Sequence, residues 1–348
     1  MSENPFTLMY GKTASSVVRR EEVTTKILEE FSRVNPSIPA YLITGVRGSG
    51  KTVVLRDVAR LSREKGWIVL DLNPRGDLLR SYCRTLYEEG RHLKIYVDWA
   101  LNINAPYISL TIKKETPFDD PELVAKKLTE KALKEGKRIL VTIDEVSPTD
   151  SLRYFSNFYQ SILGLNLPLC LLMTGIKENI DAISSDKSMS FLSRSPKLAL
   201  GPLDLGQTAV EYSRALGISL ERAAELAKAT KGYAFAYQVY GYFFYEDKKD
   251  MLDGELKEKV AKYLWQNGYD VLWKLLTHTE RQLLIAIAET KTASTQEILQ
   301  KTGMSMSNYQ NYRRRLIDNG LLMSSGYGKT AFALPTFDEY ARFMKAFE

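Results

Sequence analysis

The sequence predicts an α/β fold with a parallel sheet, followed by helical segments, and three observations support this prediction. Over residues 39–203, short apolar segments alternate with amphipathic ones. After Pro202 the alternation stops and helical periodicity replaces it. Residues 277–345 then show three helical segments followed by two short extended ones. Strands that alternate with helices imply a parallel sheet covered by helices on both faces.

Five segments are predicted to be strands, because each is short, apolar and often β-branched, as in strands buried on both faces. They are Ala40–Thr44, Trp67–Leu72, Ile139–Ile143, Leu169–Thr174 and Leu198–Leu200. Four amphipathic segments between them are predicted to be helices: Lys51–Lys65, Asp77–Glu89, Pro121–Glu135 and Leu152–Leu163. Residues 93–115 are less regular, and we expect an inserted hairpin there with its turn at Asn104-Ala105-Pro106.

Length and charge bound the class of protein. A chain of 348 residues exceeds what one core usually holds, so several domains are expected. We place them at residues 1–203, 204–268 and 269–348, the middle one including a charged connector at residues 246–262. The net charge of +6 and a pI near 9.0 suit a polyanionic partner without requiring one.

Several functional classes are disfavoured by the composition. No apolar run reaches the roughly 18 residues that span a bilayer, and Met-Ser-Glu-Asn-Pro at the start has no export signal. With two cysteines, two histidines and no CxxC, metal or triad chemistry based on these residues is not expected. Cys170 lies in an apolar run and is predicted to be a core residue. A reducing, cytoplasmic location and no membrane partner follow.

The stretch GVRGSGKT matches the phosphate-binding pattern GxxxxGK[ST] in full, after a predicted strand and before a predicted helix. Its glycines let the backbone N–H groups surround phosphate oxygens, its lysine adds a cation, and its threonine can bind Mg²⁺. The alternative is a structural turn without a ligand. A dinucleotide fingerprint is excluded, because a third glycine is missing. The residues expected to bind the nucleotide are Gly45, Gly48, Ser49, Gly50, Lys51 and Thr52.

A carboxylate pair follows another predicted strand, as ATP hydrolysis requires. Asp144 stands at the carboxyl end of Ile139–Ile143, where ligands bind in open α/β sheets, and is expected to bind Mg²⁺. Glu145 beside it can activate a water, which favours hydrolysis over transfer to a substrate hydroxyl. The alternative is that the pair only begins a loop. Thr174 would face the γ-phosphate if its strand lies between the other two.

These motifs resemble the AAA+ and STAND ATPases, most closely the branch of origin-recognition and helicase-loader proteins. The resemblance covers nearly the whole chain. Its specific part is the glycine loop with Asp144-Glu145. Weaker matches are Asn4-Pro5-Phe6, Arg20-Glu21, Phe191-Leu-Ser-Arg194, Gly201-Pro202-Leu203 and Lys231-Gly232-Tyr233.

The resemblance implies an AAA+-like P-loop NTPase core, a helical lid and a C-terminal winged helix-turn-helix domain. It also implies that the segment from Tyr10 to Arg20 contacts the adenine. Arg194 would be an arginine finger that reaches a neighbouring subunit, or else an ordinary surface arginine. One departure matters: Phe235 stands where the lid of this branch carries a nucleotide-sensing arginine. This departure points to slow turnover and switch-like behaviour.

The C-terminal unit is predicted to be a winged helix. Thr277 and Glu280 can form a capping box at the first helix. A second helix is expected over Ser294–Thr302 and a third over Ser305–Asn319, each followed by a glycine. Residues 321–334 then read as a hairpin.

The third helix of this unit has two faces. One stripe consists of Ser305, Tyr309, Tyr312 and Leu316. The opposite face presents Gln310, Asn311 and Arg314, which are side-chain types that read base edges in a major groove, and Lys329 lies at the hairpin tip. These four residues are expected to contact double-stranded DNA. The alternative is a solvated face or a protein-docking module.

The sequence therefore predicts an ATPase that binds ATP and Mg²⁺ and hydrolyses ATP slowly. Lys51, Thr174, Arg194 and Glu145 would be its catalytic residues. Its nucleotide state, ATP or ADP, would control how the winged helix engages double-stranded DNA. Homo-oligomers or protein partners are also expected. Two alternatives stay open: a nucleotide switch whose winged helix docks partner proteins, and a transcription regulator that only senses ATP.

Overall fold

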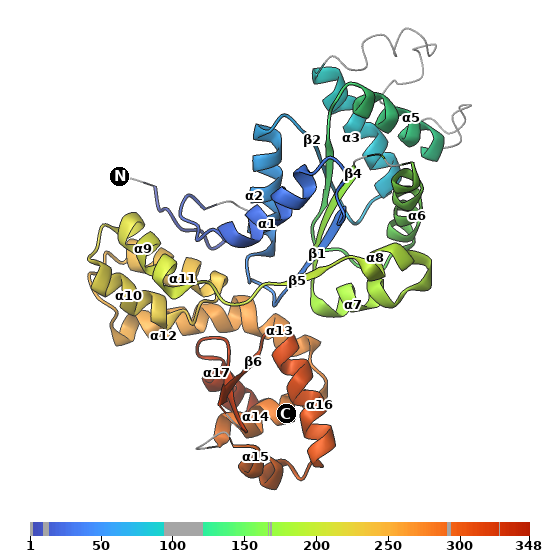
Figure 1. Cartoon of the computed structure of the whole chain (residues 1–348). Coiled ribbons are helices and arrows are strands. Elements are labelled where there is room, and N and C mark those ends of the chain that lie inside the picture. Colours follow the sequence, from blue (N-terminus) through green and yellow to red (C-terminus); the bar gives the residue numbers. More distant parts are fainter. Residues whose placement is uncertain are drawn as a thin grey trace. The chain divides into compact units, whose positions relative to one another are not determined.

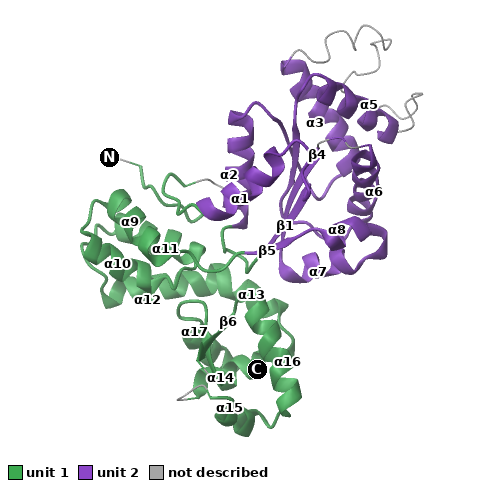
Figure 2. Cartoon of the chain, in the orientation of Figure 1, with its two compact units in different colours: residues 1–20, 45–50, 200–348 green, residues 21–44, 51–199 purple. Residues whose placement is uncertain are grey.

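The computed structural model describes residues 3–9, 14–93, 121–165, 167, 169–290, 294–326 and 328–348. The chain forms two compact units, which Figure 2 distinguishes by colour. Unit 1 consists of residues 1–20, 45–50 and 200–348, and unit 2 of residues 21–44 and 51–199. The hairpin expected over residues 93–115 lies, apart from Leu93, outside the described residues.

Unit 2 is built on a five-stranded sheet in the order β2-β3-β4-β1-β5, and every pairing is parallel. All residues of β1, β3 and β4 are buried, as expected for strands covered on both faces. The five predicted strands are confirmed, with ends that differ by at most one residue. They are β1 (Ala40–Thr44), β2 (Ile68–Leu72), β3 (Ile139–Ile143), β4 (Leu169–Gly175) and β5 (Lys197–Ala199).

Helices cover both faces of this sheet. Figure 1 shows α1 and α2 on one side and α3, α5 and α6 on the other, where Phe155 and Phe158 are fully buried in an apolar core. The four predicted helices are confirmed, with ends that differ by at most three residues; α7 and α8 were not predicted. The helices are α1 (Glu21–Ser32), α2 (Lys51–Glu64), α3 (Leu78–His92), α5 (Pro121–Lys134), α6 (Asp150–Gly164), α7 (Lys177–Ser185), η2 (Lys187–Met189) and α8 (Ser190–Arg194).

Residues 205–264 of unit 1 form helices joined by short turns. The breaks occur where the sequence predicts them: α9 ends at Gly217, whose φ of 67° is left-handed, and α10 ends before the turn at Lys231-Gly232. The charged connector largely forms α12, whose N-cap Asp253 accepts a hydrogen bond from the backbone N–H of Leu256. The helices are α9 (Leu205–Leu216), α10 (Leu220–Ala229), α11 (Ala234–Glu246) and α12 (Gly254–Leu264).

In the rest of unit 1, the three consecutive helices α14, α15 and α16 are followed by an antiparallel hairpin, which is the element order of a winged helix. The predicted capping box between Thr277 and Glu280 is present at the first of them. A final helix, α17, was not predicted. The elements are η3 (Trp265–Tyr269), α13 (Asp270–Leu275), α14 (His278–Glu289), α15 (Thr295–Thr302), α16 (Met306–Asp318), β6 (Leu322–Gly326), β7 (Lys329–Phe332), α17 (Phe337–Met344) and η4 (Lys345–Phe347).

The helices of the described residues do not include one that is both long enough and apolar enough to cross a membrane. The two cysteines, Cys83 and Cys170, are unpaired thiols. Cys170 is fully buried, which confirms its predicted place in the core. Burial raises the pKa of each thiol to about 12, so neither is a reactive nucleophile near neutral pH.

Candidate functional site

The glycine loop connects β1 to α2. Gly48 and Gly50 have φ values of 80° and 92°, which side chains other than glycine rarely adopt. A Cβ on Gly48 would also lie 2.6 Å from the hydroxyl oxygen of Tyr233, within unit 1. Both backbone conformation and a close neighbour therefore require glycine at position 48.

Three successive carbonyls of this loop accept hydrogen bonds inside unit 1. The Tyr233 hydroxyl donates to the Arg47 carbonyl (2.7 Å), and the backbone N–H of Phe235 donates to the Gly48 carbonyl (3.0 Å). Arg20 donates to the Ser49 carbonyl through Nη2 (3.2 Å). The carbonyls of Arg47, Gly48 and Ser49 are thus held by the protein. Of the N–H groups, that of Ser49 donates to the Val46 carbonyl (3.1 Å). In a glycine loop of this kind the N–H groups form the side that binds an anion.

Arg20 is therefore engaged with backbone. Its guanidinium also donates to the carbonyls of Gly201 (2.6 Å) and Pro202 (3.3 Å), and burial lowers its pKa. An adenine contact by Arg20 stays a prediction. Tyr10, the other residue expected near the base, lies outside the described residues.

In unit 2, three polar side chains form a cluster at the carboxyl ends of the strands. Thr52 donates through its hydroxyl to Oδ2 of Asp144 (2.8 Å), and Thr174 donates through its hydroxyl to the other carboxylate oxygen. The Thr174 hydroxyl also accepts from the backbone N–H of Glu145 (3.2 Å). The strand order explains the cluster, because β4 lies between β3 and β1. Thr174 therefore stands on a strand that lies between the other two, as the prediction for this residue required.

Glu145 has an unusual backbone. Its φ of 57° lies in the left-handed region, which is rare for a residue with a long side chain. The neighbouring residue is anchored, because the N–H of Val146 donates to the carbonyl of Thr174 (2.8 Å). The side chain of Glu145 is exposed. Strain of this kind is concentrated at functional sites.

The residues present fit a nucleoside triphosphate with Mg²⁺. In unit 1, the buried hydroxyl of Ser49 has no hydrogen-bond partner among the described residues, which is what a phosphate oxygen would supply. In unit 2, Lys51 is largely buried, and Thr52 with Asp144 forms an oxygen-only donor set of the kind that Mg²⁺ prefers. Among the described residues, no group of three or more His, Cys, Asp or Glu could hold a metal ion by itself.

Arg194 is the last residue of α8, and its side chain is exposed. It is not part of the cluster formed by Thr52, Asp144 and Thr174, and its role as an arginine finger stays a prediction.

The exposed face of α16 is as the periodicity predicts. Tyr309 and Leu316 are buried, whereas Gln310, Asn311 and Arg314 are exposed. Lys329, at the first position of β7, is exposed as well. These four side chains are available to a partner.

The arginines on either side of Arg314 hold the fold. Arg313 donates to the hydroxyls of Thr330 and Ser324, both at 2.7 Å, and so ties α16 to the hairpin. Arg315 pairs with the fully buried Glu280 of the capping box at 3.0 Å. Arg314 thus stands between two arginines that bind other parts of the fold, although the side chain of Arg315 is itself half exposed.

Sequence reasoning missed the contact of Tyr233 with the loop and that of Arg313 with the hairpin. One feature of the sequence could have drawn attention to Tyr233, namely the glycine at position 232 directly before it. A Cβ on Gly232 would lie 2.7 Å from the carbonyl oxygen of Leu203, so the turn packs closely on another segment. Which segment, and what Tyr233 then reaches, is not readable from the sequence.

Solved structures share this fold over nearly their whole length. A Walker-type ATPase of Pyrococcus abyssi matches with a TM-score of 0.65 at 17% identity, over 97% of this chain and 99% of that one. The ORC2 protein of Aeropyrum pernix, in ADPNP-ADP complexes, matches with a TM-score of 0.54 at 14% identity, over 94% of each chain. Its ADP form matches with a TM-score of 0.51 at 13% identity.

Two comparisons at the sequence level complete the picture. Residues 266–341 match a family model described as a domain of unknown function (DUF8462). No curated protein matches the chain. At the level of fold, the resemblance to origin-recognition ATPases is confirmed: this chain has the P-loop ATPase fold found in the Pyrococcus abyssi ATPase and the Aeropyrum pernix ORC2 protein.

Proposed function

We propose that this protein is an AAA+-type ATPase that binds ATP with Mg²⁺, hydrolyses it slowly, and uses its nucleotide state to control how its C-terminal winged helix engages double-stranded DNA. The observation that carries the proposal is the hydrogen-bonded cluster of Thr52, Asp144 and Thr174. Thr52 is the last residue of the phosphate-binding pattern, and the other two lie at the carboxyl ends of neighbouring strands. The Aeropyrum pernix relative was solved with ADPNP and ADP, which supports adenine nucleotides as ligands.

The glycine loop binds phosphate in this proposal. Its N–H groups and the hydroxyl of Ser49 donate to phosphate oxygens, and Lys51 neutralises their charge. Thr52 and Asp144 are the residues that would hold Mg²⁺. When bound, this ion neutralises the charge that develops on the phosphates.

Glu145 is the proposed general base. Its exposed carboxylate can accept the proton of an attacking water, while Thr174 fixes the backbone on which it stands. Phe235 has no charge to stabilise the γ-phosphate, which supports slow turnover. Arg194, exposed at the end of α8, could supply that charge to a second copy of the chain in a homo-oligomer.

DNA engagement would use the exposed face of α16. Gln310, Asn311 and Arg314 carry the donors and acceptors that pair with base edges, and Lys329 supplies a cation for phosphate. The net charge of +6 supports a polyanionic partner. The proposed division of labour is a nucleotide-binding core at residues 1–203, a lid at 204–268 and a DNA-binding unit at 269–348.

The test is fluorescence anisotropy with a generic DNA duplex, in ATP and in ADP, over a salt series. We expect binding that weakens steeply with salt, because lysine and arginine displace counterions from phosphates. We also expect the affinity to differ between ATP and ADP. No binding at low salt with either nucleotide would overturn the DNA role.

A second candidate function is a nucleotide switch that docks proteins. The observation in its favour is the exposure of Met306 on α16 and Met323 on β6, each 49% exposed. Methionine is common at adaptable protein-binding surfaces. Replacing both by Ser should leave DNA affinity within about twofold if DNA is the partner, because neither side chain carries charge.

A further inference from the structure

The glycine loop completes the N-terminus of helix α11. The first N–H groups of a helix have no partner within it and need one from outside. The N-cap of α11 is Tyr233, whose side chain makes no capping hydrogen bond. The carbonyl of Gly48 instead accepts from the N–H of Phe235 in the first turn (3.0 Å). The conformation of the loop therefore bears directly on how α11 begins.

Tyr233 makes a second link at the same place. Its hydroxyl donates to the Arg47 carbonyl at 2.7 Å. That carbonyl and the N–H of Gly48 belong to one peptide group. An anion bound to that N–H polarises the group and strengthens the hydrogen bond at its carbonyl, since linked hydrogen bonds reinforce one another.

The ring of Tyr233 continues towards the C-terminal elements. It lies near-parallel to the ring of Tyr269, with centroids 6.5 Å apart. The hydroxyl of Tyr269 donates to the carbonyl of Pro335 (2.5 Å), and its ring packs against Phe337 at 4.8 Å. A contiguous set of contacts thus runs from Arg47 to the start of α17, all within unit 1.

A parallel link starts two residues earlier. The amine of Lys231 donates to the carbonyls of Phe332 (3.3 Å) and Leu334 (3.4 Å), at the end of the hairpin strand β7. The same short turn, residues 231–233, therefore contacts the glycine loop through one side chain and the hairpin through another.

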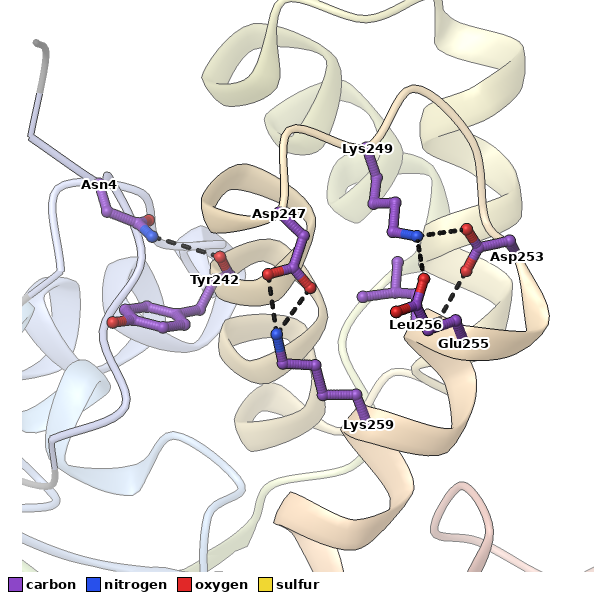
Figure 3. Close-up of polar contacts among 8 residues, drawn as sticks. All are labelled: Asn4, Tyr242, Asp247, Lys249, Asp253, Glu255, Leu256 and Lys259. Atoms are coloured by element: carbon purple, nitrogen blue, oxygen red, sulfur yellow. Dashed lines mark hydrogen bonds and ion pairs between the residues drawn. The ribbon is translucent and has the colours of Figure 1, made fainter.

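Helices α11 and α12 are fastened together at their far end, as Figure 3 shows. Lys259 of α12 donates to both carboxylate oxygens of Asp247, each at 2.8 Å. Lys249 donates to Asp253 (2.7 Å) and Glu255 (2.6 Å), and these hydrogen bonds raise its pKa. These ion pairs cross-link the end of α11 that lies away from the glycine loop to α12.

We propose that Tyr233 is a positioning residue that couples phosphate binding at the glycine loop to the C-terminal winged helix, through the Arg47 carbonyl on one side and Tyr269 on the other. This inference rests on the proposed nucleotide function. Phe235 stands where an arginine would sense the nucleotide by its charge, and it has no charge. The inference assigns this coupling to Tyr233 instead. The lid then senses the loop through its backbone carbonyls rather than through the phosphate itself.

The test compares Tyr233→Phe with Tyr212→Phe in the full-length protein. Tyr212 is a matched control, because its hydroxyl also donates to a backbone carbonyl at 2.7 Å, that of Tyr237, but does not contact the glycine loop. Calorimetry gives the affinity for ADP and for a non-hydrolysable ATP analogue. Hydrogen exchange with and without nucleotide then reports protection at residues 233–240 and 328–337.

In the parent we expect nucleotide to slow exchange in both segments. Tyr233→Phe should weaken nucleotide binding by about twofold to tenfold, the effect of one net hydrogen bond. It should also return exchange at residues 328–337 to the nucleotide-free rate, while Tyr212→Phe behaves like the parent. A purely structural role would speed exchange equally with and without nucleotide.

Two results would overturn the inference, and they are distinguishable. If Tyr233→Phe keeps the nucleotide-induced protection of the parent, or Tyr212→Phe loses it to the same extent, the coupling role of Tyr233 is wrong while nucleotide binding stands. If the parent itself binds neither nucleotide, the proposed function fails and the inference fails with it.

Discussion

The polar contacts around the glycine loop of unit 1 differ in kind from those at the strand ends of unit 2. In unit 2, the side chains of Thr52, Asp144 and Thr174 hydrogen-bond to one another at the strand ends. In unit 1, Tyr233 and Arg20 donate to backbone carbonyls of the glycine loop. Side chains that hold each other define a place for chemistry, whereas side chains that hold backbone define the conformation of a segment. We therefore expect unit 2 variants to change turnover and unit 1 variants to change coupling.

The largest effect is expected for Glu145→Gln. Removing a general base should lower the rate of ATP hydrolysis by about 10²- to 10⁴-fold, while nucleotide affinity stays within about twofold. Phosphate-release kinetics and calorimetry measure the two quantities. Glu135→Gln, an exposed glutamate of the same unit, is the control. A Glu145→Gln protein that hydrolyses ATP like the parent would show that Glu145 is not the base.

Lys51→Ala should weaken nucleotide binding by about 100-fold, because a charge-assisted hydrogen bond to phosphate is lost. Calorimetry with ADP and the ATP analogue measures it, and the exposed Lys65→Ala provides the control. Equal affinity in the Lys51 variant and the parent would mean that the loop is a structural turn.

Thr174→Val tests whether the cluster in unit 2 governs turnover. The substitution keeps the shape of the buried side chain but removes the hydroxyl that links Asp144 to the backbone of Glu145. We expect the hydrolysis rate to fall by about thirtyfold, as for a hydrogen bond to a charged group, with a much smaller change in affinity. The reverse pattern, lower affinity at an unchanged rate, would contradict the assignment.

Arg314→Ala tests the exposed face of α16 in unit 1. DNA affinity should fall by about tenfold, with ATP hydrolysis unchanged, because Arg314 lies in the C-terminal unit and not in the cluster of unit 2. Anisotropy at fixed salt measures the affinity. If Arg314→Ala and the parent bind the duplex equally, α16 is not the DNA-reading element.

The smallest effect is expected for the stability of Arg315→Ala, compared with that of Arg314→Ala. Arg315→Ala removes the partner of the buried Glu280 and should lower the free energy of unfolding by about 1–2 kcal/mol, less than for a fully buried pair because Arg315 is half exposed. Arg314→Ala should change it by less than about 0.5 kcal/mol. Urea denaturation compares the two, and equal losses of stability would show that Arg315 carries no structural role.

Local patterns predicted much of this molecule. The five strands follow from short runs rich in apolar and β-branched residues, and β1, β3 and β4 are buried throughout as such composition predicts, whereas β5 is largely exposed. The helix ends follow from capping residues such as Thr277 with Glu280 and from Gly217. The phosphate-binding pattern is also local, since loop conformation and donor groups lie within eight consecutive residues.

Other features depend on segments that are distant in the sequence. Asp144 meets Thr52 and Thr174 because β4 lies between β3 and β1, an order that no single strand encodes. The three arginines 313–315 are identical in type, yet Arg313 and Arg315 bind other parts of the fold, whereas Arg314 lies on the exposed face of α16. Helix α17 contains Phe337 and Tyr340, whose burial depends on neighbours such as Tyr269.

The sequence by itself determined the parallel α/β core, the phosphate-binding loop, its carboxylates and the winged-helix order of the last elements, because each depends on residues close together in the chain. Only the tertiary structure decided that Thr174 holds Asp144, that Arg313 and Arg315 bind other parts of the fold, and that Tyr233 closes on the carbonyl of Arg47. The physical reason is that a hydrogen bond requires two groups within about 3 Å, and folding brings together groups that are distant in the sequence, such as Arg47 and Tyr233, which are 186 positions apart.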